Sequence, residues 1–154
     1  MNKIESKNKG FTIIEVLIVL AIAGLILLIV FLAVPALQRN SRNNARSADA
    51  SKVLAAVSEC LSNRNGQVTS CDAANGSEIV SNGGLDMTSL GQIDTIQVTN
   101  GTGGTVTDPN ILRIAFGQSC DNNGAFVANT NNRAFAALYI KETGGAPTAV
   151  CIES

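Results

Sequence analysis

Residues 9–37 read KGFTIIEVLIVLAIAGLILLIVFLAVPAL, and this stretch decides the fold. From Phe11 onward its only polar side chains are those of Thr12 and Glu15. A helix needs ~20 apolar residues to cross the hydrocarbon core of a bilayer, and the run after Glu15 reaches that length. So long an apolar helix would be unusual as the buried core helix of a small water-soluble protein. We therefore expect a membrane-embedded helix at about residues 11–37.

Three kinds of membrane segment compete to explain this stretch. A secretory signal peptide has an apolar region of ~7–15 residues that ends in an Ala-x-Ala-like site. The run is longer than that, and Ala33-Val34-Pro35-Ala36 is a poor cleavage signal. A plain single-pass anchor explains the length but not Glu15, because a carboxylate at membrane depth costs ~2.5–3.5 kcal/mol. The third interpretation is an anchor that also assembles with other helices.

An acidic residue within a membrane usually has a partner, and the apolar run contains no Lys or Arg to serve as one. The partner of Glu15 must come from another chain, from the chain's own terminus, or from a proton. Cleavage between Gly10 and Phe11 would create an ammonium group four residues before Glu15. In a stack of parallel helices, this ammonium would meet the Glu15 of a neighbour. Such a buried pair would set the axial register of the helices rather than add stability.

The segment Lys9-Gly10-Phe11-Thr12-Ile13-Ile14-Glu15-Val16 resembles the prepilin motif of type IV pilins and of the related pseudopilins. The resemblance implies a cytoplasmic leader of residues 1–10, which a prepilin peptidase removes by cutting after Gly10. It also implies N-methylation of Phe11, and it makes Glu15 the acidic residue of the assembling helix. The implied partners are further copies of the chain in a helical filament and the pilus assembly machinery of the inner membrane.

The charges that flank the apolar run do not decide its orientation. Three lysines precede the run and favour a cytoplasmic N-terminus: Lys3, Lys7 and Lys9. Three arginines follow it and favour the opposite orientation: Arg39, Arg42 and Arg46. We interpret these arginines as a solvated or headgroup-facing cluster rather than as contacts between subunits. Cysteines beyond the run, together with the resemblance, favour a single-pass protein of the cell membrane with its head outside, which then joins an extracellular pilus.

The helix is expected to continue beyond the membrane. Four apolar residues recur on one face of the continuation: Val53, Leu54, Val57 and Leu61. Asn65 and Gly66 follow this pattern and suit a left-handed cap at the end of the helix. We therefore predict one long helix over residues 11–63, whose second half presents an apolar stripe to the rest of the protein.

Residues 64–154 are predicted to form a small globular, β-rich head. Clusters of Gly, Asn and Pro separate four strand-like runs: Ile93–Thr99, Ile111–Phe116, Arg133–Lys141 and Thr148–Ile152. The Gly101–Gly104 turn between the first two runs suggests an antiparallel hairpin or meander. The expected fold is α+β and pilin-like. Its long N-terminal helix, transmembrane in its first half, packs on a small antiparallel sheet that disulfides reinforce.

The cysteines are even in number, and all lie beyond the apolar run: Cys60, Cys71, Cys120 and Cys151. Their wide spacings argue against a zinc site. In an oxidising exterior, two disulfides are expected, with three possible pairings; free thiols in a cytoplasmic domain are the alternative. We favour Cys60–Cys71, which would hold the loop after the helix. We also favour Cys120–Cys151, which would resemble the C-terminal disulfide loop that the pilin resemblance implies.

The composition offers little for catalysis. The chain has no histidine, so catalysis and metal binding through imidazole are excluded. Asp108 and Asp121 suit a calcium site in principle, but the spacing of an EF-hand loop is missing. We expect no enzymatic activity, no cofactor and no metal. Removal of residues 1–10 takes three lysines and one glutamate, which changes the net charge from −1 to −3 and makes direct binding of nucleic acid unfavourable.

The function that these features favour is structural. We expect a subunit of a type IV pilus filament that serves adhesion, twitching motility or DNA uptake. The first alternative is a pseudopilin of a type II secretion or competence system, against which the two-disulfide pattern argues. The second is a single-pass membrane-anchored binding module, which would keep its leader and would be indifferent to replacement of Glu15.

Overall fold

The computed structural model describes residues 10–73, 75–101 and 104–154. The leader residues 1–9, including Lys3, Lys7 and Lys9, lie outside the described residues. The chain forms two compact units, one that ends at Gln38 and one that runs from Arg39 to Ser154. The long helix α1 (Ile13–Asn63) contributes residues to both units.

In the first unit, every described residue from Gly10 to Gln38 is exposed. The part of α1 that lies here is long and apolar enough to cross a membrane. Pro35 lies inside α1, and the helix continues through it. Because proline has no backbone N–H, it cannot donate a hydrogen bond to the carbonyl four residues before it. A neighbouring apolar helix or lipid tails would tolerate this defect, as they do in membrane helices.

In the second unit, α1 buries the apolar face that its sequence predicts. Val53 and Val57 are completely buried, Leu61 is nearly so, and Leu54 packs partly buried against the same core. The helix ends as expected, since Asn65 and Gly66 both adopt left-handed conformations with φ of 53° and 74°. The N–H of Gly66 donates to the carbonyl of Leu61 at 2.6 Å, which closes the last turn of the helix.

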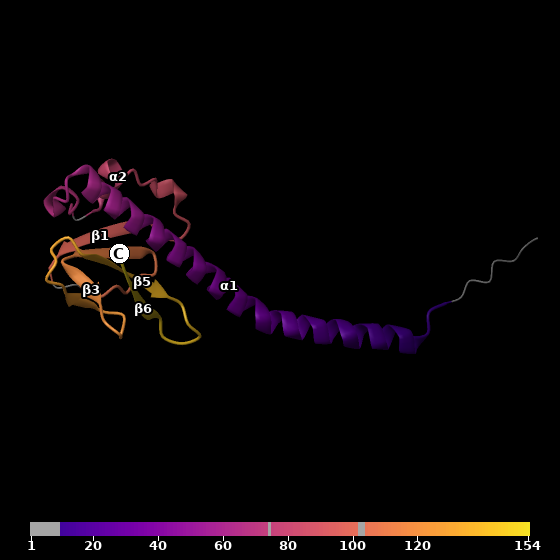
Figure 1. Ribbon diagram of the computed structural model, residues 1–154. Helices are drawn as coiled ribbons and strands as arrows, with labels where there is room; N and C mark the ends of the chain where they lie inside the picture. Colours follow the sequence, from indigo (N-terminus) through magenta and orange to yellow (C-terminus); the bar gives the residue numbers. More distant parts are fainter. Residues whose placement is uncertain (1–9, 74, 102–103) are drawn as a thin grey trace, which may run out of the picture. The chain divides into compact units, whose positions relative to one another are not determined.

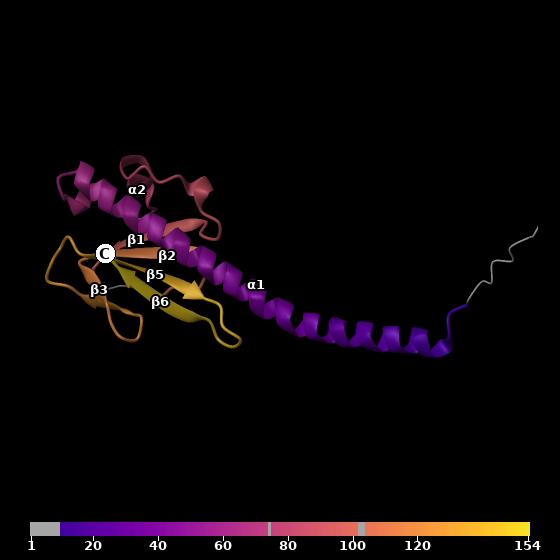
Figure 2. The same ribbon diagram turned by 45° about the vertical axis from the view of Figure 1, so that its right-hand side comes forward.

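The head contains a four-stranded sheet with the strand order β1-β2-β5-β6, which lies beside the second half of α1 (Figure 1, Figure 2). Its strands are β1 (Thr95–Asn100), β2 (Ile111–Phe116), β5 (Phe135–Lys141) and β6 (Thr148–Glu153). A second sheet pairs two short antiparallel strands, β3 (Gln118–Cys120) and β4 (Phe126–Ala128). The α+β, pilin-like class that the sequence predicts is confirmed.

The expectation of an antiparallel sheet is wrong for one pair of strands. β1 and β2 run parallel, with Thr95 opposite Ile111, so the sheet is mixed. The predicted hairpin at Gly101–Gly104 is therefore absent, although two residues of that turn lie outside the described part of the chain. A parallel partner must begin at the same end of the sheet, so the connection has to travel back along the whole strand. Val106 in this connection is buried against Leu138 and Ile140 of β5.

The central strand β5 is buried on both of its faces. Phe135, Ala137 and Tyr139 point into the main core, which also contains the apolar residues of α1. Leu138 and Ile140 alternate with them and join a second, smaller cluster. This alternation follows from the two-residue period of a strand. The returning connection between β1 and β2 thus covers the face of the sheet that α1 leaves open.

Three short helices lie between α1 and the sheet in sequence, and the pattern of residues predicted none of them. They are η1 (Val68–Ser70), α2 (Ser77–Asn82) and η2 (Met87–Ser89). Ile79 of α2 is fully buried in the main core. Directly after α2, Gly83 approaches α1 so closely that a Cβ atom there would lie 2.1 Å from the carbonyl oxygen of Ala56. Only glycine allows this contact between the two backbones.

Two disulfides link segments of the head. Cys60 on α1 bonds to Cys71 after η1, with a Cα–Cα distance of 6.1 Å. Cys120 at the end of β3 bonds to Cys151 of β6, with a Cα–Cα distance of 5.6 Å. The first bond holds the loop that follows α1. The second attaches the small sheet to the edge strand of the large one.

Candidate assembly site at the start of the long helix

Thr12 and Glu15 form a capping box at the start of α1. The backbone N–H and the hydroxyl of Thr12 both donate to Oε2 of Glu15, at 2.9 and 2.8 Å. In return, the backbone N–H of Glu15 donates to Oγ1 of Thr12 at 3.3 Å. These reciprocal bonds satisfy N–H groups that have no partner within the helix. They explain why α1 begins at Ile13, two residues later than the sequence analysis expects.

The capping box gives Glu15 a partner that the sequence analysis did not consider. That analysis sought the partner in another chain, at the chain's own terminus or in a proton. The signal for a local partner was present, because Thr-x-x-Glu before an apolar run is the pattern of a capping box. The donors from Thr12 are neutral, however, so they reduce the cost of the buried carboxylate without cancelling its charge. The partial positive charge at the start of a helix acts in the same direction.

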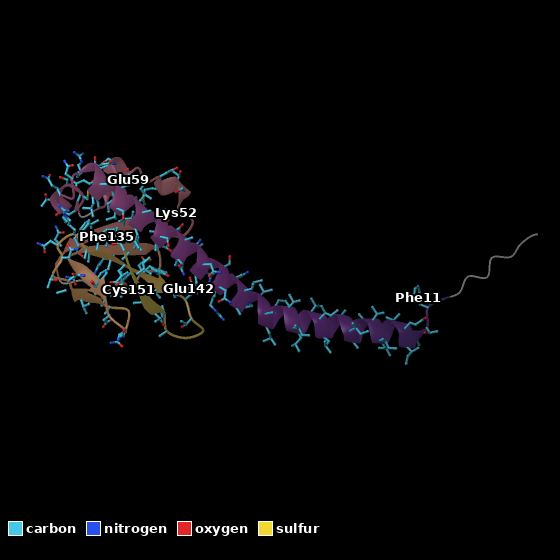
Figure 3. All side chains as sticks on the ribbon, viewed as in Figure 1. Phe11, Lys52, Glu59, Phe135, Glu142 and Cys151 are labelled. Carbon is cyan, nitrogen blue, oxygen red and sulfur yellow. A yellow bond between two sulfur atoms is a disulfide. The ribbon has the colours of Figure 1, made fainter. Side chains whose placement is uncertain are left out.

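Phe11 and Glu15 line one hollow on the surface of the first unit. The hollow has a volume of about 330 Å³, and its remaining walls are Val16, Val19 and Leu20. Phe11 itself is 88% exposed and lies at the N-terminal end of the row of projecting side chains in Figure 3. The site therefore combines a carboxylate with an apolar surface that nothing in the chain covers among the described residues.

The cleavage position that the motif predicts is open to a protease. Gly10 and Phe11 are both exposed, and a Cβ atom at Gly10 would meet no atom of the described chain within 4 Å. The backbone between them precedes the first turn of α1. A peptidase would therefore reach this bond without unfolding the helix.

The arginines that follow the apolar run are not the solvated cluster that the sequence analysis expects. Arg46 is only 2% exposed, and its Nη2 donates to Oε1 of Glu142 at 2.6 Å. Arg42 binds the other oxygen of Glu142, with Nη2 at 2.5 Å. Asn43 adds two bonds to the backbone of Glu142, one through its amide nitrogen and one through its amide oxygen. We call these four residues the Glu142 clamp.

The charges of the Glu142 clamp change the acidity of its carboxyl group. Hydrogen bonds from Arg42 and then Arg46 lower the pKa of Glu142 to about 2, although partial burial acts in the opposite direction. The same bonds raise the pKa of Arg42. The expectation of a solvated cluster overlooked Glu142 because it lies 96 residues from Arg46 in sequence. Only the fold brings them together.

The two carboxylates considered for calcium belong to ordinary turns. Asp121 accepts from the backbone N–H groups of Asn123 and Ala125, at 2.9 and 2.7 Å. The bond from Ala125 is the main reason that the pKa of Asp121 is lowered. Asp108 accepts from the N–H of Asn110 at 2.8 Å. Across residues 10–73, 75–101 and 104–154, no three His, Cys, Asp or Glu side chains group as a metal site.

Comparison with known proteins bears on the start of the chain. Residues 6–31 match the family model of the prokaryotic N-terminal methylation motif. No curated protein and no solved structure matches the chain. The matched segment contains Gly10, Phe11 and Glu15, and it ends within the apolar run. The motif supports a type IV pilin-like or pseudopilin protein, and it implies processing by a prepilin peptidase. The chain thus carries the cleavage and methylation motif of type IV prepilins on a pilin-like α+β architecture.

Proposed function

We propose that this chain is a structural subunit of a type IV pilus filament and that it assembles through α1. The observation that carries the proposal is the complete exposure of an apolar helix directly after the methylation motif. Twenty apolar residues in water would be strongly unfavourable, at about 25 cal/mol for each Å². Two environments would cover them, namely lipid before assembly and the helices of neighbouring subunits afterwards. A filament subunit uses both environments in turn.

Glu15 provides the specificity of this assembly. After cleavage behind Gly10, the new ammonium group of Phe11 would carry the only positive charge near the apolar helix. An incoming subunit would place this group against the Glu15 of its neighbour, beside the hollow that Phe11 and Glu15 line. The two hydrogen bonds from Thr12 both end on Oε2, so they hold the carboxylate in one orientation. Oε1 is then directed to the partner subunit.

The proposal includes a path through the cell. Residues 1–10 are the cytoplasmic leader, residues 11–37 are the membrane-embedded part of the helix, and residues 64–154 are the external head. A prepilin peptidase cuts after Gly10, Phe11 is methylated, and the assembly machinery of the inner membrane adds the subunit to an extracellular filament. The two disulfides support an external head, because such bonds persist in oxidising compartments. The filament would serve adhesion, twitching motility or DNA uptake.

A pseudopilin of a type II secretion or competence system would carry the same motif. The two machines differ in where the assembled chain is found. A pilus subunit is recovered in filaments sheared from the cell surface, whereas a pseudopilin stays with the envelope. A membrane-anchored binding module would retain Met1 and would appear in neither assembly.

The decisive measurement is mass spectrometry of the N-terminus of the mature protein. We expect a chain that begins with methylated Phe11. An intact Met1 would reject both the cleavage and the proposal.

A pair of variants separates assembly from helix capping. Glu15→Gln preserves the capping box, because glutamine is accepted at that position, but it removes the charge. Thr12→Val removes the cap and keeps the carboxylate. We expect Glu15→Gln to reduce the yield of sheared filaments at least tenfold without affecting membrane insertion, and Thr12→Val to assemble nearly normally. Equal yields from Glu15→Gln and the unaltered chain would contradict the proposed role of Glu15.

A further inference from the structure

A polar pocket of about 370 Å³ opens in the head, away from every residue used above. It lies where three segments meet, namely η1, the end of β1 and the corner between β2 and β3. Its size falls at the lower end of the ~300–1,000 Å³ of small-molecule sites. The polar side chains that line it are Thr69, Asp72, Asn100, Gln118 and Asn132. We call it the Gln118 pocket.

Gln118 is the residue that a simple surface depression does not explain. It is only 4% exposed, yet its side-chain amide makes no hydrogen bond to any residue in the described part of the chain. A buried polar group without a partner costs about 1–3 kcal/mol, so folded proteins rarely keep one without a reason. Because Gln118 lines the pocket, a molecule bound there would supply the missing partner.

The opposite wall of the pocket is arranged in advance. Asp72 is held in place by a hydrogen bond from the side-chain amide of Asn100. This bond leaves a carboxylate oxygen and an amide oxygen side by side at the rim, with the amide of Asn132 also at the pocket. The Cys60–Cys71 disulfide fixes the segment directly before Asp72. A preorganised set of polar groups loses little entropy when a ligand binds.

The chemistry of the lining selects the class of ligand. Asp72 is the one charged residue among those that line the pocket, so an anion would be repelled. Amides both donate and accept hydrogen bonds, as do the hydroxyl groups of a sugar. Val68 and Phe116 add an apolar surface, which suits the C–H face of a sugar ring. We propose that the Gln118 pocket binds one ring of a neutral saccharide.

A metal ion would fit these observations less well. A single carboxylate with neutral amides is a weak ligand set for a hard cation such as calcium, which prefers several carboxylates. One oxygen of that carboxylate is already engaged by Asn100. Calcium binding therefore becomes an outcome that the experiment below would reveal.

The test uses the full chain in a zwitterionic detergent that has no sugar headgroup. Saturation-transfer NMR would be recorded with glucose, galactose, mannose and their N-acetylated forms, and with sialic acid as the anionic control. We expect at least one neutral sugar to bind with a Kd of about 10 mM or tighter. Sialic acid should not bind. If no neutral sugar gives a signal, or if only calcium shifts the protein's spectrum, the proposal is wrong.

A matched pair of variants assigns the binding to the pocket. Gln118→Met keeps the length of the side chain and removes its amide, and Gln92→Met makes the same change outside the pocket. We expect Gln118→Met to weaken sugar binding at least tenfold and Gln92→Met to leave it unchanged. Gln118→Met should also not lower the unfolding midpoint, because the lost amide had no partner. Unchanged binding in Gln118→Met, or a loss of binding together with a lower midpoint, would overturn the role assigned to Gln118.

Discussion

Arg46 and Glu142 form an ion pair at 2.6 Å between α1 and the loop that follows β5, although 96 positions separate them in sequence. The guanidinium of Arg46 is almost entirely buried, and Glu142 keeps a quarter of its side-chain surface exposed (Figure 3). The pair therefore does more than decorate the surface of the head. It supplies the counter-charge for a cation that the fold has taken out of water.

We expect Glu142→Ala to destabilise the head by about 2–3 kcal/mol. The variant leaves the buried guanidinium of Arg46 without a counter-charge, which costs more than loss of an exposed pair. Arg42→Ala is the matched variant, because Arg42 binds the same carboxylate but is 41% exposed. It should cost less than about 1 kcal/mol. Denaturant unfolding of the full chain, followed by circular dichroism, measures both values, and equal losses would contradict the role given to burial.

The stability of the head should fall as the pH drops from about 4.5 to about 2. The pKa of Glu142 is about 2 in the folded protein and close to its ordinary value of 4.5 when the chain is unfolded. The unfolded chain therefore takes up the proton first, so the contribution of Glu142 is complete above pH 4.5 and is lost on acidification. Asp121 and Asp86, whose pKa values are also lowered, act in the same direction.

Glu142→Gln isolates the part of this dependence that belongs to the clamp. The variant cannot titrate, so its unfolding free energy should vary less between pH 5 and pH 2 than that of the unaltered chain. The difference between the two curves should shrink toward low pH. Parallel curves over this range would show that Glu142 does not titrate with a lowered pKa.

We expect Gly83→Ala to destabilise the head by about 1–3 kcal/mol. The added methyl group would overlap the carbonyl oxygen of Ala56, so α2 would have to move away from α1. Gly91→Ala is the control, because the nearest atom to a Cβ there is a carboxylate oxygen of Asp49 at an ordinary 3.9 Å. Its effect on the midpoint of thermal unfolding should be small. A tolerated alanine at Gly83 would mean that α2 is not packed as closely as the structure shows.

The two disulfides should differ in their resistance to reduction. Cys60 and Cys71 are completely buried, whereas Cys120 and Cys151 are each partly exposed. Because a reducing thiolate must reach a sulfur atom, the Cys120–Cys151 bond should open first under mild reductant. Alkylation of the released thiols, followed by peptide mass spectrometry, gives the order. Earlier labelling of Cys60 would contradict this prediction and would indicate that the loop after α1 opens readily.

Local patterns predicted the elements that repeat over several turns or residues. The buried stripe of α1 and its left-handed end at Asn65 and Gly66 were readable, since periodicity and turn chemistry are properties of neighbouring residues. β2 was predicted with its exact bounds, Ile111–Phe116, because it is a compact apolar run between turn residues. β3 and β4 were missed, since three-residue strands are too short to show a period.

Features that depend on distant residues were not readable. The parallel pairing of β1 with β2 depends on where the connection packs, and Val106 reveals this only when β5 is beside it. The burial of Arg46 likewise depends on Glu142. At the assembly site, Gly10, Phe11 and Glu15 form a local motif, so the residues could be named, and the capping role of Thr12 was available from the same few letters.

The capping box also says something about maturation. Its bonds begin at Thr12, one residue behind the predicted cut, so the first turn of the helix draws on nothing that the leader provides. Proteolysis would then leave the shape of the subunit as it was and alter only its electrical character. Maturation in this protein would be a switch in charge at the tip of a rod that is already rigid.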